Sequence, residues 1–62
     1  MKMTKARLGM LEQLEREPGS YASYYPPLKW LLENGYAKST EGRYRDNYEL
    51  THAGRKLLAE HR

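Results

Sequence analysis

The sequence contains no cysteine and no phenylalanine, and its apolar runs are short. Without cysteine the chain cannot form disulfides, thiolate zinc sites or a cysteine nucleophile. No apolar stretch approaches the roughly 20 residues of a membrane span, and the first residues do not resemble the apolar core of a signal peptide. We therefore expect a cytoplasmic protein with no membrane contact, whose fold depends on side-chain packing.

The composition indicates one small globular domain. The 62 residues are enough for a single domain, which we expect to span residues 1–62. Hydrophobic residues make up 39% and charged residues 31%, a balance typical of globular rather than disordered chains. A net charge of +3 permits binding to a polyanion without requiring it. The aromatic residues are six Tyr and one Trp, which suit half-buried positions and contact surfaces.

The first segment has the leucine spacing of an amphipathic helix. It begins after Thr4, which can serve as N-cap, and ends at Pro18 and Gly19, since proline cannot continue a helix. Its apolar face consists of Leu8, Leu11 and Leu14, widened by Met10 and Ala6. We expect this face to contribute to the core.

A second helix begins at Pro26 and Pro27, because proline is tolerated in a first turn. It ends at Asn34 and Gly35, where glycine can adopt the left-handed cap. Its apolar positions are Leu28, Leu31 and Leu32. Residues 20–25, which precede it, are expected to form a loop or a single helical turn.

The remaining sequence predicts a β-hairpin and a last helix. Residues 36–40 and 44–50 have the pattern of two antiparallel strands, with the turn inside residues 41–47. The last helix extends from residue 52 to about residue 61, with Thr51 as N-cap. Its expected inward residues are Ala53, Leu57 and Leu58. The fold class is therefore α+β, three helices with a two-stranded hairpin in the order α-α-β-β-α.

Four sequence features follow one another along the chain: a leucine-rich helix end, a glycine, a returning strand, and a helix that begins after Leu-Thr. They occupy Leu31-Leu32-Glu33-Asn34-Gly35-Tyr36 and Tyr48-Glu49-Leu50-Thr51-His52-Ala53-Gly54-Arg55-Lys56-Leu57-Leu58. These stretches resemble the second half of a winged helix-turn-helix domain of the bacterial and archaeal transcription-regulator type. The resemblance implies a small winged-helix domain, with residues 27–34 as recognition helix and residues 41–47 as wing. Gly54 is then expected to allow a close backbone approach.

The sequence departs from this family before the recognition helix. Only residues 17–26 separate the first helix from Pro27, so the second helix of a helix-turn-helix is shortened or missing. Two tyrosines and two prolines replace the polar side chains that usually read bases. Lys29 is the one obvious polar side chain on this helix that could contact base edges. We therefore expect the protein to distinguish few bases.

The resemblance implies double-stranded DNA as partner, bound by a transcriptional regulator that acts as a dimer or by an accessory factor, with a homodimer or a protein partner as possible further associations. Arg43 and Arg45 occupy the wing with Tyr44 between them, Lys38 lies on the strand beneath, and Lys29 lies on the recognition helix. Arginine and lysine side chains there would neutralise phosphates and position the domain. The alternative for the arginines is a solvated hairpin tip, partly neutralised by neighbouring acidic residues.

A second hypothesis is a protein-interaction or inhibitor module that keeps the winged fold without sequence-specific DNA reading. Its candidate partner-binding residues are Tyr21, Tyr24, Tyr25 and Trp30. The three tyrosines have the i, i+3, i+4 spacing of one helical face, and we expect them to pack at the core edge. We expect the same of Trp30, against the alternative of an exposed anchor for a protein partner.

No motif in the sequence relates its serine, histidine and acidic residues in a catalytic arrangement, and no phosphate-cradling glycine loop is present. His52 and His61 are well separated, and we expect them at the surface near the two ends of the last helix. We therefore expect no enzymatic activity, no metal, no cofactor and no small-molecule substrate.

Overall fold

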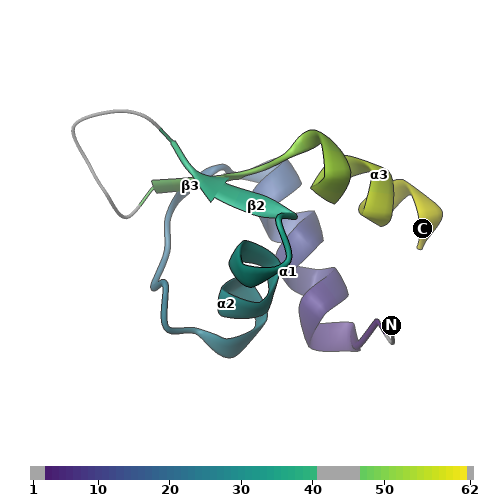
Figure 1. Ribbon diagram of the computed structural model, residues 1–62, viewed down its shortest axis with the longest axis horizontal. Coiled ribbons are helices and arrows are strands. Elements are labelled where there is room, and N and C mark those ends of the chain that lie inside the picture. Colours follow the sequence, from purple (N-terminus) through teal and green to yellow (C-terminus); the bar gives the residue numbers. More distant parts are fainter. Residues whose placement is uncertain (1–2, 41–46, 62) are drawn as a thin grey trace.

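Three helices and three strands make up the part of the chain that the computed structural model describes, residues 3–40 and 47–61 (Figure 1). They are α1 (Lys5–Arg16), β1 (Gly19–Ser20), α2 (Pro26–Glu33), β2 (Ala37–Ser39), β3 (Asn47–Leu50) and α3 (His52–Glu60). The strands form one antiparallel sheet in the order β1-β3-β2. The domain is thus α+β, which confirms the predicted class.

The predicted bounds of α1 are confirmed. The Thr4 hydroxyl accepts a hydrogen bond from the Arg7 amide at 3.2 Å, and the helix ends at Arg16, shortly before Pro18. Its buried residues are Met10, Leu11 and Leu14. The expectation that Ala6 widens the apolar face was wrong: Ala6 is exposed, because its side of α1 borders an open groove rather than packed side chains.

Helix α2 begins at Pro26 and buries Pro27, Leu28 and Leu31. The chain reverses after it at Gly35, whose φ of +76° lies in the left-handed region that favours glycine. The predicted start and stop of this helix are therefore confirmed. Residues 21–25, all of them described, contain no helix, so β1 and α2 are joined by a short link.

Strand β3 is the centre of the sheet. Strand β2 pairs with it in the register Ala37↔Leu50, Lys38↔Glu49 and Ser39↔Tyr48. On its other edge β1 pairs through Gly19↔Tyr48 and Ser20↔Asn47. The predicted antiparallel pairing of the two hairpin strands is therefore confirmed, but the prediction of a sheet with only two strands was wrong, because β1 adds a third strand. Two residues are too few for an alternating pattern, and β1 is defined only by its pairing with a strand distant in sequence.

Thr51 joins the hairpin to α3. Its hydroxyl accepts a hydrogen bond from the Gly54 amide at 3.1 Å, as predicted for an N-cap, and donates one to the Gly35 carbonyl at 2.7 Å. Gly54 is buried against the backbone of Tyr36, which confirms the expected close approach. Ala53 is exposed, and its predicted inward position was wrong because Gly54, one residue later, occupies the inner face.

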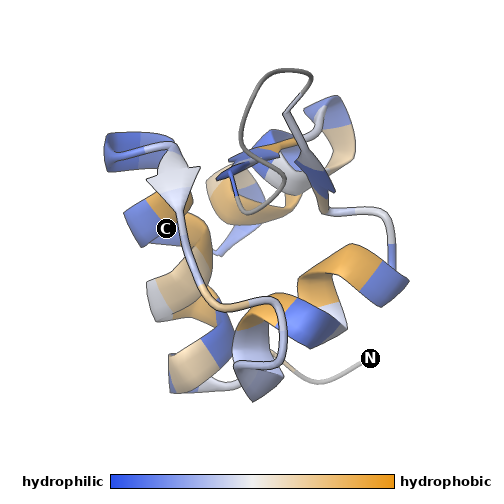
Figure 2. Ribbon diagram, turned by 90° about the vertical axis from the view of Figure 1, so that its left-hand side faces the viewer, coloured by the Kyte–Doolittle hydropathy of each residue, from blue (hydrophilic) through white to orange (hydrophobic). Residues whose placement is uncertain are grey.

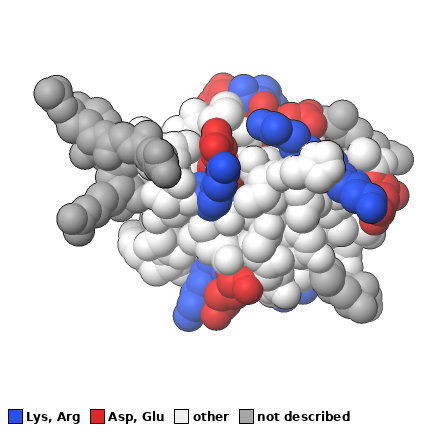
Figure 3. Space-filling view, turned by 45° about the horizontal axis from the view of Figure 1, so that its top comes forward, with Lys and Arg blue, Asp and Glu red and all other residues white. Residues whose placement is uncertain are grey.

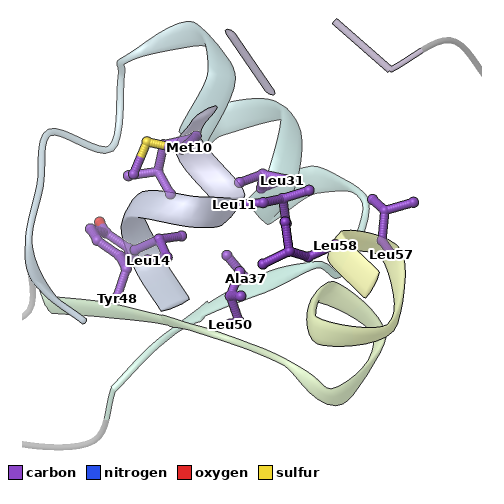
Figure 4. Close-up of a cluster of buried hydrophobic side chains, with 10 residues drawn as sticks. Met10, Leu11, Leu14, Leu31, Ala37, Tyr48, Leu50, Leu57 and Leu58 are labelled. Carbon is purple, nitrogen blue, oxygen red and sulfur yellow. The ribbon is translucent and has the colours of Figure 1, made fainter. Parts of the chain in front are cut away.

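The core lies between the three described helices and the sheet, where its side chains point toward one another (Figure 4). It consists of Met10, Leu11, Leu14, Leu28, Leu31, Ala37, Tyr48, Leu50, Leu57 and Leu58. Each helix in Figure 2 carries both hydrophobic and hydrophilic stretches, as expected for amphipathic helices around one core. Within residues 3–40 and 47–61, no helix combines the length and the hydropathy that a membrane span requires.

Candidate nucleic-acid interface

The solvent side of α2 and the residues directly before it form the first part of the candidate interface. Lys29 is exposed on the helix. Tyr24 and Tyr25 immediately precede it, with 83% and 51% of their surface exposed. The predicted core-edge packing of these two tyrosines was therefore wrong. The i, i+3, i+4 spacing of Tyr21, Tyr24 and Tyr25 would place the three side chains on a common face only if the segment were a helix. Residues 21–25 are not helical.

The backbone explains why the two tyrosines point away from the core. The Tyr25 amide donates to the Ala22 carbonyl at 3.1 Å, which closes a turn before the helix. Tyr25 itself is extended, with φ −63° and ψ 121°, as is usual for a residue before proline. Pro26 and Pro27 supply no amide hydrogen at the helix start, so side chains must make the polar contacts there.

Tyr21 and Trp30 do pack at the core edge, as predicted. The Tyr21 hydroxyl donates a hydrogen bond to the Glu17 carbonyl just after α1. The Arg7 guanidinium lies 4.2 Å from the centre of the Trp30 ring, and the Tyr36 ring centre lies 5.5 Å away. Trp30 is thus held between α1 and the start of the hairpin, so less of its surface is available for contact with a partner protein.

The β2–β3 hairpin forms the second part of the candidate interface. The Thr40 amide donates to the Asn47 carbonyl at 2.9 Å, so the strands are held together up to these residues. Lys38 lies 3.6 Å from the Glu49 carboxylate across the strands and is 60% exposed. Basic side chains, drawn in blue, and acidic side chains, drawn in red, also lie next to one another on the face shown in Figure 3. The predicted wing residues Arg43, Tyr44 and Arg45 lie outside the described residues.

The fold brings only some of the predicted site residues together. Tyr24, Tyr25 and Lys29 follow one another along the start of α2, whereas Lys38 belongs to the sheet. His52 and His61 are exposed, as predicted, and no group of three or more metal-ligating side chains occurs among the described residues. No protein-family model, curated protein or solved structure matches this chain.

Sequence reasoning missed a groove between α1 and the link of residues 21–25. It has a volume of about 580 Å³, and we call it the α1 groove. Its lining residues are Ala6, Gly9, Met10, Gln13, Tyr21, Ala22, Tyr24 and Tyr25. A signal was present in the sequence, because Gly9 interrupts a helix whose neighbouring positions favour helix formation. The two exposed tyrosines therefore border both this groove and the start of α2.

Proposed function

We propose that this chain is a small winged-helix domain that binds double-stranded DNA and catalyses no reaction. The observation that carries the proposal is the direct succession of α2, the Gly35 turn and the paired β2–β3 hairpin, fixed to α3 by Thr51. A recognition helix followed by a hairpin wing is the arrangement that the sequence resemblance implies. The domain acts in the cytoplasm as a transcriptional regulator or accessory factor.

The start of α2 supplies donors for the DNA backbone. The ammonium group of Lys29 and the phenol hydroxyls of Tyr24 and Tyr25 are exposed along one short stretch. Such groups donate hydrogen bonds to phosphate oxygens and fix the orientation of a protein on the duplex. The positive end of the α2 dipole adds a favourable, though small, contribution for an anion.

The hairpin supplies the second contact. By sequence, Arg43 and Arg45 lie between Thr40 and Asn47, which a hydrogen bond joins. Two arginines that neutralise phosphates would add affinity that weakens as the salt concentration rises. Lys38 can join them, because a surface ion pair such as that with Glu49 contributes little stability and can exchange for a phosphate.

Base reading is limited in this proposal. At the C-terminal end of α2, Glu33 is exposed and acidic. The side-chain amide of Asn34, the C-cap residue, donates a hydrogen bond to the Trp30 carbonyl at 2.8 Å. Lys29 is then the principal base-reading candidate in α2, and one contact gives little discrimination among sequences. The domain therefore binds by phosphate contacts and positions a larger assembly rather than reading a long site.

A fluorescence-anisotropy titration of random duplex tests the proposal at about 50 and about 200 mM salt. We expect wild-type affinity to fall with salt. The Arg43→Ala/Arg45→Ala double variant should bind more weakly, with the slope of log affinity against log salt reduced by about two. Unchanged affinity in the double variant would exclude the wing contact.

A protein-interaction module is the second candidate function, favoured by the exposure of Tyr24 beside an uncharged groove. Exposed tyrosines and neutral surfaces are enriched in protein interfaces. If no salt-sensitive binding to duplex occurs at either salt concentration, this second function replaces the first. Tyr21, Tyr25 and Trp30 then remain its further candidate contacts.

A further inference from the structure

None of the described residues that line the α1 groove is charged, although nearly a third of the chain is charged. One wall is a stripe on α1 made by Ala6, Gly9, Met10 and Gln13, and the other is the link that carries the tyrosines. Tyr24, at 83% exposure, is the most exposed large hydrophobic residue among the described residues. A neutral concave surface with exposed aromatic rings is typical of a protein contact surface.

Gly9 indicates how close a partner comes. Glycine within a helix lowers its stability relative to alanine. Nothing in the described domain requires glycine here, since its φ is not positive and a Cβ would meet no atom within 4 Å. The missing side chain instead leaves the α1 backbone open to close approach by another surface.

The charges that border the stripe indicate a second copy of this chain. Lys5 and Glu12 are exposed on α1, four residues before and three residues after Gly9. If two α1 helices cross antiparallel at Gly9, each Lys5 comes beside Glu12 of the second copy, and symmetry makes two such pairs. A parallel crossing would oppose like charges instead.

We propose that two copies of this chain form a two-fold dimer through the α1 groove, with their α1 helices crossing antiparallel at Gly9. The rings of Tyr24 and Tyr25 of each copy cover the α1 helix of the other, while their hydroxyl groups stay at the outer edge of the contact, where they can still reach a duplex. The tyrosine rings and the uncharged stripe are then removed from water, which adds buried apolar area to a domain too small for a large core. This dimer does not depend on DNA binding.

Sedimentation equilibrium without DNA, from micromolar to millimolar protein, tests the dimer. We expect a reversible monomer–dimer equilibrium in the wild type. Gly9→Arg should raise the dimer dissociation constant at least about tenfold, because the long charged side chain blocks the close approach. Ala59→Arg is the matched control, since it adds the same charge at an exposed position of α3 and should leave the equilibrium unchanged.

Charge exchange tests the antiparallel direction. Lys5→Glu and Glu12→Lys should each weaken the dimer, by about fivefold at most, because each brings like charges together twice. The double variant Lys5→Glu/Glu12→Lys restores both pairs and should return the dissociation constant to the wild-type value. Circular dichroism of each variant in dilute solution confirms that the monomer is folded.

Three results would overturn the proposal: a wild type that stays monomeric at millimolar concentration, a Gly9→Arg variant that dimerises as well as the wild type, or a double charge exchange that fails to restore association. Each of these results leaves the DNA titration untouched. The DNA-binding proposal can likewise fail while the dimer stands.

Discussion

The carbonyl of Tyr36 lies so close to Gly54 that a Cβ at residue 54 would overlap it. The same carbonyl accepts a hydrogen bond from the Thr51 amide at 3.1 Å. This contact joins the start of the hairpin to the first turn of α3. The hairpin is therefore held at a fixed position after α2, which is what a wing requires.

Replacing Gly54 with alanine should destabilise the domain by about 1–3 kcal/mol, because the added methyl group meets backbone that cannot move away easily. Urea unfolding followed by circular dichroism measures the change. A Gly54→Ala variant as stable as the wild type would mean that the close approach to Tyr36 does not exist.

Gly9→Ala is the matched control and should change stability in the opposite direction. A Cβ at Gly9 has open space, so the substitution should stabilise α1 by about 0.5–1 kcal/mol through helix propensity alone. The measurement is made in dilute protein, where the proposed dimer is dissociated. Destabilisation by this variant would contradict the open position of Gly9.

Thr51→Ala should cost about 1–2 kcal/mol, because it removes both the cap bond to the Gly54 amide and the bond to the Gly35 carbonyl. Thr51→Ser retains the hydroxyl and should lie within about 0.5 kcal/mol of the wild type. Thr4→Ala, which removes a single cap bond, should cost less than Thr51→Ala. Equal losses for the two alanine variants would show that the bond to Gly35 contributes nothing.

Tyr24 and Tyr21 should separate function from stability. Tyr24→Ala should leave the unfolding free energy within about 0.5 kcal/mol, since the side chain is exposed, yet weaken DNA binding. Tyr21→Ala should lower stability, because its ring packs against the core and its hydroxyl binds the Glu17 carbonyl. Thermal unfolding and the anisotropy titration, run on the same samples, distinguish the two effects.

Lys29 and Lys56 form a matched pair of exposed lysines on α2 and α3. If α2 faces the duplex, Lys29→Ala should weaken binding and reduce the salt slope by about one. Lys56→Ala removes the same charge from a helix outside the proposed interface and should have the smaller effect. Equal losses of DNA affinity in the two variants would indicate that binding depends only on net charge and that α2 does not face the duplex.

The sequence predicts the helices of this domain well because their signals are local. Thr4 and Thr51 cap the helices that follow them, through hydrogen bonds to amides three residues later. Pro26 begins α2 and Gly35 follows its end, and both act through their own backbone torsions. The leucine spacing then identifies most of the core. Strand β1 could not be predicted in this way, since its pairing with β3 depends on residues far along the chain.

The candidate site was predicted less well, because exposure depends on how the link is folded. Tyr24 and Tyr25 have helical spacing but lie in a non-helical link, so the same spacing that placed the leucines misplaced the tyrosines. The α1 groove arises between segments that are adjacent only in the folded chain. The sequence shows a glycine at position 9, but only the structure shows that the space beside it is open.

Amide chemical-shift mapping during titration with duplex DNA shows whether the start of α2 and the hairpin contact the duplex together. We expect the largest shift changes at Tyr24, Tyr25 and Lys29, and between Thr40 and Asn47, while α3 changes little. Changes confined to α3, or no changes at all at low salt, would contradict this joint contact.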